Sequence, residues 1–434
     1  MLTLTYEYKL VPTAEQRQTF DDWLKVCSSV WNFALRERKD WASSRKCDIN
    51  ACSIRQEYII PVDVKRPTYA LQCKALTTAK KEYPCLKVPQ SQVLQQVLKR
   101  IEAAFVSMWE RGFGNPRFKK SGRMRSFVFP QMSVADVIGE HIALPKIGRV
   151  KMILSRPIPD GFDLKQARIV KRVSGYYVML SLQCDVQVPS VMPHGHPLGI
   201  DLGLNAFAAT SDGELIARPR FFVDASRKLK LLQRRLKHKK KGSSNWRKLN
   251  QRIARLHERI SSTRKDWHFK TAHYLCNSAG MIFAEDLNLK AMSRSILCKH
   301  TLDAAFGQFL SILQWVAWKR DVYFAKVNCN GTSQMCPICD ADTPKDLSVR
   351  VHSCLECGYT TDRDVAASQV VKKRGLARIN ADGQSVFQNV CREVLPGAEM
   401  SRQGSVKQKI CRGNSIESPV IFGTLRPRSG DAPN

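Results

Sequence analysis

The sequence predicts a multidomain α+β protein. We expect an N-terminal β-barrel with an inserted helical domain, followed by an α/β layer domain with an inserted zinc ribbon. Three observations carry this prediction: the apolar periodicity changes twice before residue 188, apolar strands alternate with helices after residue 198, and two pairs of cysteines stand among those α/β elements. With 434 residues, of which 43% are hydrophobic, the chain is long enough for more than one core.

The first half of the chain carries both kinds of periodicity. Residues 2–10 alternate apolar and polar side chains, as a half-buried strand does, and Thr13 then caps a predicted helix. Helical spacing continues to about residue 112, and β-rich runs separated by Pro and Gly fill residues 123–186. Because a strand precedes the helices and strands follow them, we expect the helical domain to interrupt the barrel.

The second half opens after a proline-rich linker. Leu198 to Leu204 is a predicted buried strand, and further apolar strands follow at residues 206–210 and 281–284 with two long basic helices between them. A helix is expected from Asp364 to Arg374, and weak periodicity after Gly375 favours a disordered tail. The predicted bounds are 1–11 and 123–188 for the barrel, 12–122 for the helical domain, 189–197 for the linker, 198–328 and 360–375 for the α/β domain, 329–359 for the zinc ribbon, and 376–434 for the tail.

The charge of the chain favours a polyanionic partner. Seventy Lys and Arg against 38 acids give a net charge of +32, for which nucleic acid is the best counterpart. An anionic membrane is the alternative, but we find neither an apolar span of about 18 residues nor an amphipathic membrane helix. Glu7 and Lys9 interrupt the apolar N-terminus, which therefore does not fit a secretory signal. We expect a protein of the cytoplasm or nucleoid, not secreted, without a membrane partner and favoured as a monomer.

The positive charge is concentrated in two places. Residues 226–270 hold 17 Lys and Arg against Glu258 and Asp266, a local net charge of 17 minus 2, or +15. A solvated helical surface is one explanation, but contact with phosphates is favoured because such a run repels itself. A second cluster surrounds Phe113, Phe118 and Phe127, whose rings either stack on bases or pack in the core. The candidate nucleic-acid-binding residues are Arg117, Lys119, Lys120, Lys237, Lys239, Lys240, Lys241, Arg252 and Arg255.

Four of the fifteen cysteines form a metal-ligand pattern. Cys336 and Cys339 make one C-x2-C knuckle, Cys354 and Cys357 make another, and 14 residues separate the two. Two residues between thiolates let one tight turn offer both sulfurs to a tetrahedral ion, and this spacing is typical of a zinc ribbon. Four thiolates leave no ligand position open to water, so one structural Zn2+ is expected rather than a catalytic one.

Three acidic residues are candidates for a second metal site. Asp201 stands in the opening strand between two glycines that leave room for metal and phosphate, and Glu285 ends a wholly apolar strand, where an unpaired carboxylate is costly to bury. Asp364 follows the zinc module at a predicted helix start. Enzymes that hydrolyse phosphodiester bonds with two Mg2+ ions hold those ions with carboxylate oxygens. Ion pairing of these acids with the many Arg and Lys is the alternative that the local sequence leaves open.

The order of these elements resembles the TnpB family and the related type V CRISPR effectors. Residues 199–205 (GIDLGLN) are similar to the first motif of a RuvC nuclease domain, residues 283–292 (FAEDLNLKAM) to the second, and residues 362–364 (DRD) to the third. Residues 115–120 (NPRFKK), 252–257 (RIARLH) and 331–334 (GTSQ) add support, so the resemblance covers about residues 90 to 372. In one departure, Ala366 stands where the third motif usually has Asn.

The resemblance implies a function and a set of partners. A wedge-like barrel, a helical recognition domain and an RNase H-like (RuvC) domain would form an RNA-guided DNA endonuclease. Asp201, Glu285 and Asp364 would be its catalytic, Mg2+-binding acids, with two ions expected. A transposon-derived guide RNA would pair with one strand of double-stranded target DNA, while the protein reads a short flanking motif. The alternatives are a nuclease-silent RNA-guided repressor, an RNase H-like transposase and a plain zinc-ribbon DNA-binding factor.

Overall fold

The computed structural model describes residues 2–45, 60–61, 63–188, 190–294, 297–346 and 348–381, in two compact units that divide after Val188. Most of the predicted tail, residues 382–434, lies outside the described residues. In the part of the chain that is described, no helix is long and apolar enough to cross a membrane.

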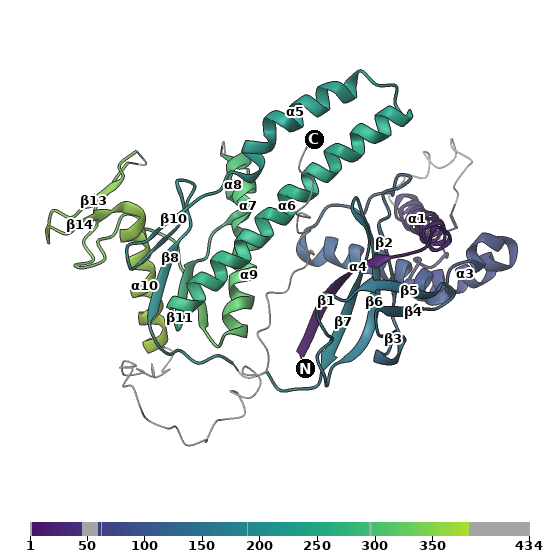
Figure 1. Ribbon diagram of the computed structural model, residues 1–434, viewed down its shortest axis with the longest axis horizontal. Helices are drawn as coiled ribbons and strands as arrows, with labels where there is room; N and C mark the ends of the chain where they lie inside the picture. The colour runs from purple at the N-terminus through teal and green to yellow at the C-terminus, as the bar shows by residue number, and fades with distance from the viewer. Residues whose placement is uncertain are drawn as a thin grey trace, which may run out of the picture. The chain divides into compact units, whose positions relative to one another are not determined.

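The first unit is built on one antiparallel sheet (Figure 1). Its seven strands run in the order β2-β6-β7-β1-β5-β4-β3, so the N-terminal strand lies in the middle, between β7 and β5. Helices that follow β1 in sequence therefore interrupt the sheet in chain order. The strands are β1 (Leu2–Val11), β2 (Ser126–Phe129), β3 (Val137–Ile138), β4 (His141–Leu144), β5 (Gly148–Ile153), β6 (Asp163–Arg172) and β7 (Gly175–Cys184).

The sheet is open rather than a closed barrel. Among the described residues, no hydrogen-bonded pairing joins the two end strands β2 and β3. The short β2 instead packs against helices: Trp23 of the first helix contacts the rings of Phe127 and Phe129, with centroids 5.5 and 5.9 Å away. Covering an edge strand with helices is an alternative to closing a sheet on itself. The predicted barrel is thus corrected to a sheet with helical cover.

The inserted helices begin where the sequence places a cap. Thr13 and Gln16 form a capping box at the start of the first helix, with Gln16 N–H donating to Thr13 Oγ1 at 3.2 Å. The last helix buries an apolar stripe at helical spacing, formed by Val93, Leu94, Val97, Leu98 and Ile101. The inserted helices are α1 (Ala14–Ser44), α3 (Tyr69–Glu82), the 3-10 helix η2 (Pro84–Lys87) and α4 (Ser91–Arg111). A second 3-10 helix, η3 (Val134–Asp136), follows β2.

The second unit is a mixed α/β domain. Its sheet has the order β10-β9-β8-β11-β12, in which β8, β11 and β12 are parallel and the first two strands antiparallel to their neighbours. The strands are β8 (Pro197–Asp201), β9 (Ala206–Thr210), β10 (Leu215–Ala217), β11 (Met281–Glu285) and β12 (Tyr323–Val327), and a separate hairpin pairs β13 (Val351–Ser353) with β14 (Thr360–Asp362). The helices are α5 (Phe221–Lys237), α6 (Ser244–Ser278), α7 (Leu289–Met292), α8 (Cys298–Ala304), α9 (Phe306–Lys319) and α10 (Arg363–Ala381).

Helices cover both faces of this second sheet (Figure 1). Successive strand residues point to opposite faces, so Ile282 joins the core beneath α6 and α9, whereas Phe283 packs with Val371 and Ile379 of α10. Because the strands are buried on both sides, they read as continuous apolar runs in the sequence.

Helix α10 extends further than predicted. We expected it to end at Arg374, yet the helix continues to Ala381, six residues into the predicted tail. A Cβ at Gly375 would lie 2.2 Å from the ring of Phe283. The glycine therefore permits close packing of α10 on β11 and does not end the helix.

Candidate active site and nucleic-acid surfaces

Asp201 and Glu285 end two neighbouring parallel strands. The register places Ala284 of β11 beside Ile200 of β8, so the next residue of each strand is one of the two acids. The carboxyl ends of parallel strands are a common place for ligand sites in α/β domains. Glu285 is only 6% exposed.

Asp364 lies near these strand ends, on helix α10, which packs on one face of the sheet. It lies in the first turn of α10, and Asp362 caps that turn by accepting from the Asp364 N–H at 2.8 Å. The Asp364 Oδ2 atom is 3.8 Å from the point where a Cβ on Gly203 would stand, directly after β8. The negative potentials of both Asp364 and Glu285 act on Asp201. The three acids from distant segments are thus near enough to interact electrostatically, although among the described residues no group of three carboxylates has its oxygens all within 4.8 Å.

Burial and mutual repulsion disfavour the charged forms of these acids. Removal from water, and then the charges of Glu285 and Asp364, raise the pKa of Asp201 to about 8. Burial also raises the pKa of Glu285, against a hydrogen bond from Thr332, and the pKa of Asp364, with the charge of Asp362 adding to the effect. A cluster of this kind is stabilised by a bound cation.

The predicted alternative, in which these acids pair with Arg and Lys, does not describe the structure. Among the described residues, no Lys or Arg nitrogen lies within 4.0 Å of a carboxylate oxygen of Asp201, Glu285 or Asp364. The adjacent Asp286 differs, because it is exposed and pairs with Lys326 at 3.3 Å. The chemistry of the three acids therefore fits hard divalent cations such as Mg2+.

The two glycines beside Asp201 have different roles. Gly203 lies beside Asp364, which agrees with the expectation that this glycine leaves room next to the acids. Gly199 does not: a Cβ there would lie 2.0 Å from the Ser368 carbonyl oxygen and 2.7 Å from the Lys372 nitrogen. Its small size lets α10 pack directly on β8, which corrects the expectation that Gly199 makes room for metal.

Sequence reasoning missed one side chain of this site. Thr332 is 5% exposed, and its Oγ1 donates to Glu285 Oε1 at 2.5 Å. It lies in the GTSQ stretch that supports the family resemblance, but nothing in the sequence assigned it a partner. Ala366, at the position where the third motif usually has Asn, is buried in α10.

The four predicted zinc ligands converge. The sulfurs of Cys336, Cys339, Cys354 and Cys357 all lie within 4.8 Å of one another. The Cys336–Cys357 and Cys339–Cys354 sulfur separations are 3.6 and 3.5 Å. A tetrahedral ion with Zn–S bonds of about 2.3 Å would set the sulfurs roughly 3.8 Å apart. The cluster therefore has the size that one Zn2+ needs.

Both knuckles are built on the same backbone pattern. The N–H of Cys336 donates to the carbonyl of Ala341 and that of Cys354 to the carbonyl of Tyr359, each at 2.9 Å and five residues on. Four residues after the first cysteine, Asp340 and Gly358 both have positive φ angles, 61° and 69°. Local turns therefore suffice to present the sulfurs in pairs.

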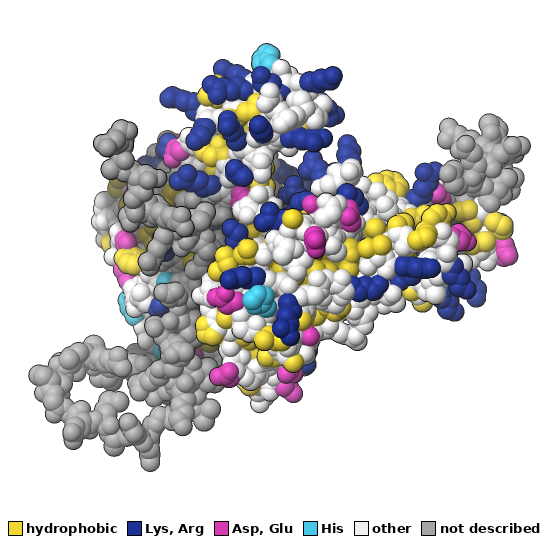
Figure 2. All heavy atoms as spheres, turned by 45° about the vertical axis from the view of Figure 1, so that its right-hand side comes forward, with side chains coloured by type: hydrophobic (Ala, Val, Ile, Leu, Met, Phe, Trp, Pro, Cys, Tyr) yellow, Lys and Arg dark blue, Asp and Glu magenta, His cyan; other side chains and the backbone are white. Residues whose placement is uncertain are grey.

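A dense basic surface covers the outer part of the α5–α6 hairpin. Figure 2 shows Lys and Arg side chains crowded there. Six predicted residues lie on it, all exposed, and none forms an ion pair within the described part of the chain: Lys237, Lys239, Lys240, Lys241, Arg252 and Arg255. The base of the hairpin is fixed by buried Asp303 of α8, which accepts from the backbone N–H of Phe222 at 2.8 Å and from Arg264 at 3.3 Å.

The other predicted basic residues lie on a loop that α1 holds in place. The Asn32 side chain bonds both backbone groups of Lys119, donating to its carbonyl at 2.9 Å and accepting from its N–H at 2.7 Å. Arg117 and Lys120 are exposed and Lys119 is half-buried, with its ammonium 4.8 Å from the centre of the Trp31 ring. The aromatic residues divide: Phe113 and Phe118 are 60% and 48% exposed, whereas Phe127 belongs to the core.

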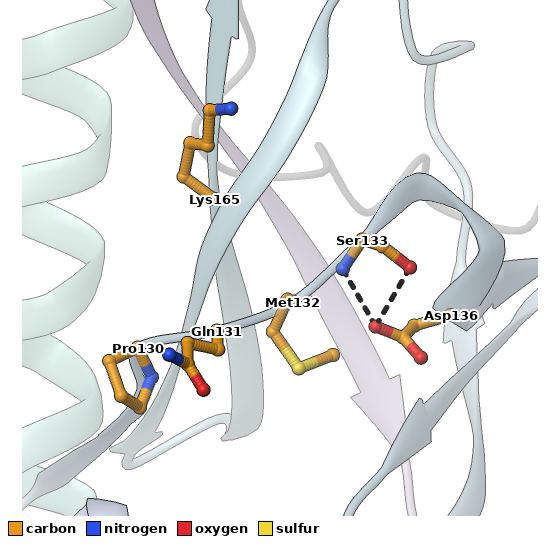
Figure 3. Close-up of a pocket in the computed structure, with 6 residues that line it drawn as sticks. All are labelled: Pro130, Gln131, Met132, Ser133, Asp136 and Lys165. Carbon is orange, nitrogen blue, oxygen red and sulfur yellow. Dashed lines mark hydrogen bonds between the residues drawn. The ribbon is translucent and has the colours of Figure 1, made fainter.

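A pocket in the first unit offers no comparable chemistry (Figure 3). Its acid, Asp136, is used locally, because Oδ2 accepts from the Ser133 N–H at 2.7 Å. Lys165 pairs with Asp163 at 3.0 Å. The pocket is lined by Pro130, Gln131, Met132, Ser133, Asp136 and Lys165.

Three family descriptions match successive parts of the chain. "Probable transposase" matches residues 181–295, "Cas12f1-like, TNB domain" matches 306–371, and "Helix-turn-helix domain" matches 1–47. The last description does not fit the local structure, because residues 2–45 form strand β1 and one continuous helix, α1. The other two cover the segments that carry all three acids and the four cysteines.

Relatives match over nearly the whole chain. The "Putative RNA-guided DNA endonuclease InsQ" of Escherichia coli (strain K12) is 28% identical over 86% of this chain and 92% of its own length. A "Putative RNA-guided DNA endonuclease" of Streptomyces pristinaespiralis is 27% identical over 93% and 95%. The TnpB-like protein L79 of Acanthamoeba polyphaga mimivirus is 29% identical over 31% and 27%.

Solved structures are more distant. A Cas12f1–sgRNA–target DNA complex matches with a TM-score of 0.49 and 14% identity, covering 83% of each chain. The mini-RNA-guided endonuclease CRISPR-Cas_phi3 matches with a TM-score of 0.42 and 10% identity, covering 86% of this chain and 92% of its own. The matched family descriptions and the relatives confirm the resemblance predicted from the motifs: the chain is similar to TnpB-like proteins.

Proposed function

We propose that this chain is an RNA-guided DNA endonuclease that hydrolyses phosphodiester bonds with Mg2+ held by Asp201, Glu285 and Asp364. The observation that carries the proposal is the electrostatic interaction of Asp201 with Glu285 and Asp364, acids from separate segments, with no Lys or Arg within ion-pair distance among the described residues. Two relatives that match most of this chain and are named as putative RNA-guided DNA endonucleases support the proposal.

The chemistry follows from the ligands. Two Mg2+ ions, when bound, would activate the attacking water and stabilise the leaving oxygen. The protein's part is to hold oxygen ligands in place: Asp201 and Glu285 on rigid strand ends, and Asp364 on the first turn of a helix packed against those strands. In this proposal the second unit is an RNase H-like (RuvC) domain, and the cysteine cluster holds one structural Zn2+.

In this proposal the basic surfaces bind the nucleic acids. We assign the hairpin residues Lys237, Lys239, Lys240, Lys241, Arg252 and Arg255, and the loop residues Arg117, Lys119 and Lys120, to phosphate contacts with a guide RNA and double-stranded target DNA. Cations without acidic partners gain most from phosphates, because each contact releases condensed counterions. Phe113 and Phe118 are placed to stack on unpaired bases, whereas Phe127 is not. The predicted domain bounds, with a wedge-like sheet and a helical recognition domain, belong to the same proposal.

Guide dependence is the decisive property to test. The full chain is co-expressed with the RNA encoded beside its gene, purified, and incubated with Mg2+ and plasmids that carry a randomised flank beside a guide-matched or a scrambled target. We expect double-strand cuts in matched plasmids only, with one flank enriched. Binding of matched targets without cuts would favour the silent repressor, and a preparation without bound RNA would contradict the guided function altogether.

A further inference from the structure

Thr332 belongs to a loop that returns to the end of β11. The chain leaves the sheet at Val327 of β12, which pairs with Glu285 in parallel register. Five residues later it comes back, and the Thr332 hydroxyl donates to Glu285 Oε1 at 2.5 Å. Both side chains are almost fully buried, at 5% and 6% exposure. A hydrogen bond between two buried polar groups favours one orientation of the Glu285 carboxylate.

The hydrogen bond restricts what Glu285 can do. At 2.5 Å, this is a short hydrogen bond between two oxygen atoms. With Oε1 held by Thr332, Oε2 is the oxygen left for a cation. Partners of this kind orient metal ligands, and their loss typically weakens metal affinity or activity about 10- to 100-fold.

The loop is fastened on both sides of Thr332. Before it, one guanidinium nitrogen of Arg374 in α10 donates to the carbonyls of Asn328 and Asn330, both at 2.8 Å. After it, the first cysteine knuckle begins at Cys336, whose turn is closed by an antiparallel bridge between Met335 and Asp342. The position of the hydroxyl is therefore set by α10 on one side and by the cysteine module on the other.

We propose that Thr332 is a positioning residue that holds one oxygen of Glu285 and leaves the other for a divalent cation, so that the zinc module helps to shape the carboxylate site. This inference rests on the proposed function, because it assumes that Glu285 binds metal. It goes beyond that function in making the cysteine module part of the support of a metal ligand in addition to its structural role.

The test separates the donor from the shape of the side chain. Thr332→Val keeps the branched shape without the donor, and Thr332→Ser keeps the donor; Thr332→Ala replaces valine if that variant does not fold. Thr343→Val is the matched control, because its hydroxyl donates to the Gln334 carbonyl at 3.0 Å in the same module and does not contact Glu285. Mn2+ binding to the full chain is measured by calorimetry, and the Mg2+ dependence of cleavage is measured in parallel.

We expect Thr332→Val to weaken Mn2+ binding about tenfold or more and to raise the Mg2+ requirement by a similar factor, with Thr332→Ser and Thr343→Val close to the parent protein. If the parent binds Mn2+ and cleaves, and the valine or alanine variant matches it, the inference fails while the proposed function stands. Equal losses in the serine and valine variants would also overturn it, because the donor would not be the cause. If the parent itself neither binds Mn2+ nor cleaves, the proposed function fails.

Discussion

The two candidate metal sites of this protein are built in opposite ways. The thiolate cluster takes its four ligands from one short stretch, residues 336–357, and shapes each pair with a local turn. The carboxylate cluster takes its ligands from residues 201, 285 and 364, which meet only because two strands share a register and a helix packs against them. The first site depends on spacing and the second on the whole α/β core.

The electrostatics differ in the same sense. Four thiolates satisfy the coordination of one ion and leave no position open. Three carboxylates with raised pKa values, one buried and two half-buried, leave positions for water and substrate. We therefore expect the thiolate cluster to hold its metal permanently and the carboxylate cluster to exchange it. Thr332, between the two, is the side chain through which one site would affect the other.

The largest effect is expected from breaking the thiolate cluster. Structural Zn2+ binds small thiolate modules with about 10–16 kcal/mol, so losing one of four ligands should release it. The parent protein should hold one zinc per chain by elemental analysis after dialysis, and Cys354→Ser should hold much less. Cys298→Ser, in α8 and outside the cluster, serves as the control. Full zinc retention by Cys354→Ser would show that these sulfurs are not the ligands.

Acid should weaken the core that positions the carboxylates. Burial lowers the pKa of His268 to about 4, against a hydrogen bond to the Ala304 carbonyl. Because the folded-state pKa is depressed below 6.5, the associated stability is present above pH 6.5 and lost as pH falls toward 4, by roughly 3 kcal/mol. Chemical unfolding between pH 7 and 4 should show this loss, and His268→Phe should show a smaller pH dependence. Equal pH dependence in the two proteins would rule out His268 as its source.

Helix α10 offers a test of the packing that brings Asp364 to the strands. Gly375→Ala improves helix propensity by about 1 kcal/mol, yet we expect a net destabilisation of roughly 1–3 kcal/mol because the new methyl group meets the Phe283 ring. The measurement is denaturant unfolding. Ala377→Gly, on the exposed side of the same helix, reports the propensity effect alone. A stabilised Gly375→Ala variant would contradict the close approach of α10 to β11.

The smallest of these effects concerns the basic hairpin. Replacing Lys239, Lys240 and Lys241 by Gln should weaken binding of the co-purified RNA and lower the slope of log affinity against log salt by about 2. Filter binding across a salt series measures both quantities. Lys151→Gln with Lys165→Gln is the control, because these lysines already pair with Glu140 and Asp163. An unchanged slope in the triple variant would remove the hairpin tip from the interface.

The sequence was sufficient where chemistry is local. The two knuckles follow from cysteine spacing, and Thr13 marks the start of α1 as predicted. Glu285 was recognised because an unpaired carboxylate at the end of an apolar strand is costly to bury. Where two elements meet, single-sequence patterns were not sufficient. The helix was expected to end at Arg374, because Phe283, the residue that Gly375 packs against, lies in a strand far earlier in the chain.

Other features depend on packing in the same way. Whether the first sheet closes depends on pairings between strands far apart, and short β2 gives no sign of its helical cover. Thr332 contacts Glu285 because of the path of the loop that carries it, and the residue types in that loop do not predict this path. Phe113, Phe118 and Phe127 are alike in sequence, and only the fold separates the two exposed rings from the buried one.

The central claim is that the carboxylate cluster is the active site, and one comparison tests it most directly. Single-turnover cleavage of a guide-matched target in Mg2+ is measured for the parent, Asp201→Asn and Asp286→Asn. The two substitutions make the same chemical change, but Asp286 is exposed and paired with Lys326. Metal catalysis worth several kcal/mol predicts a loss of about a thousandfold or more for Asp201→Asn. Asp286→Asn should stay within about threefold of the parent. Equal rates for Asp201→Asn and the parent would contradict the claim.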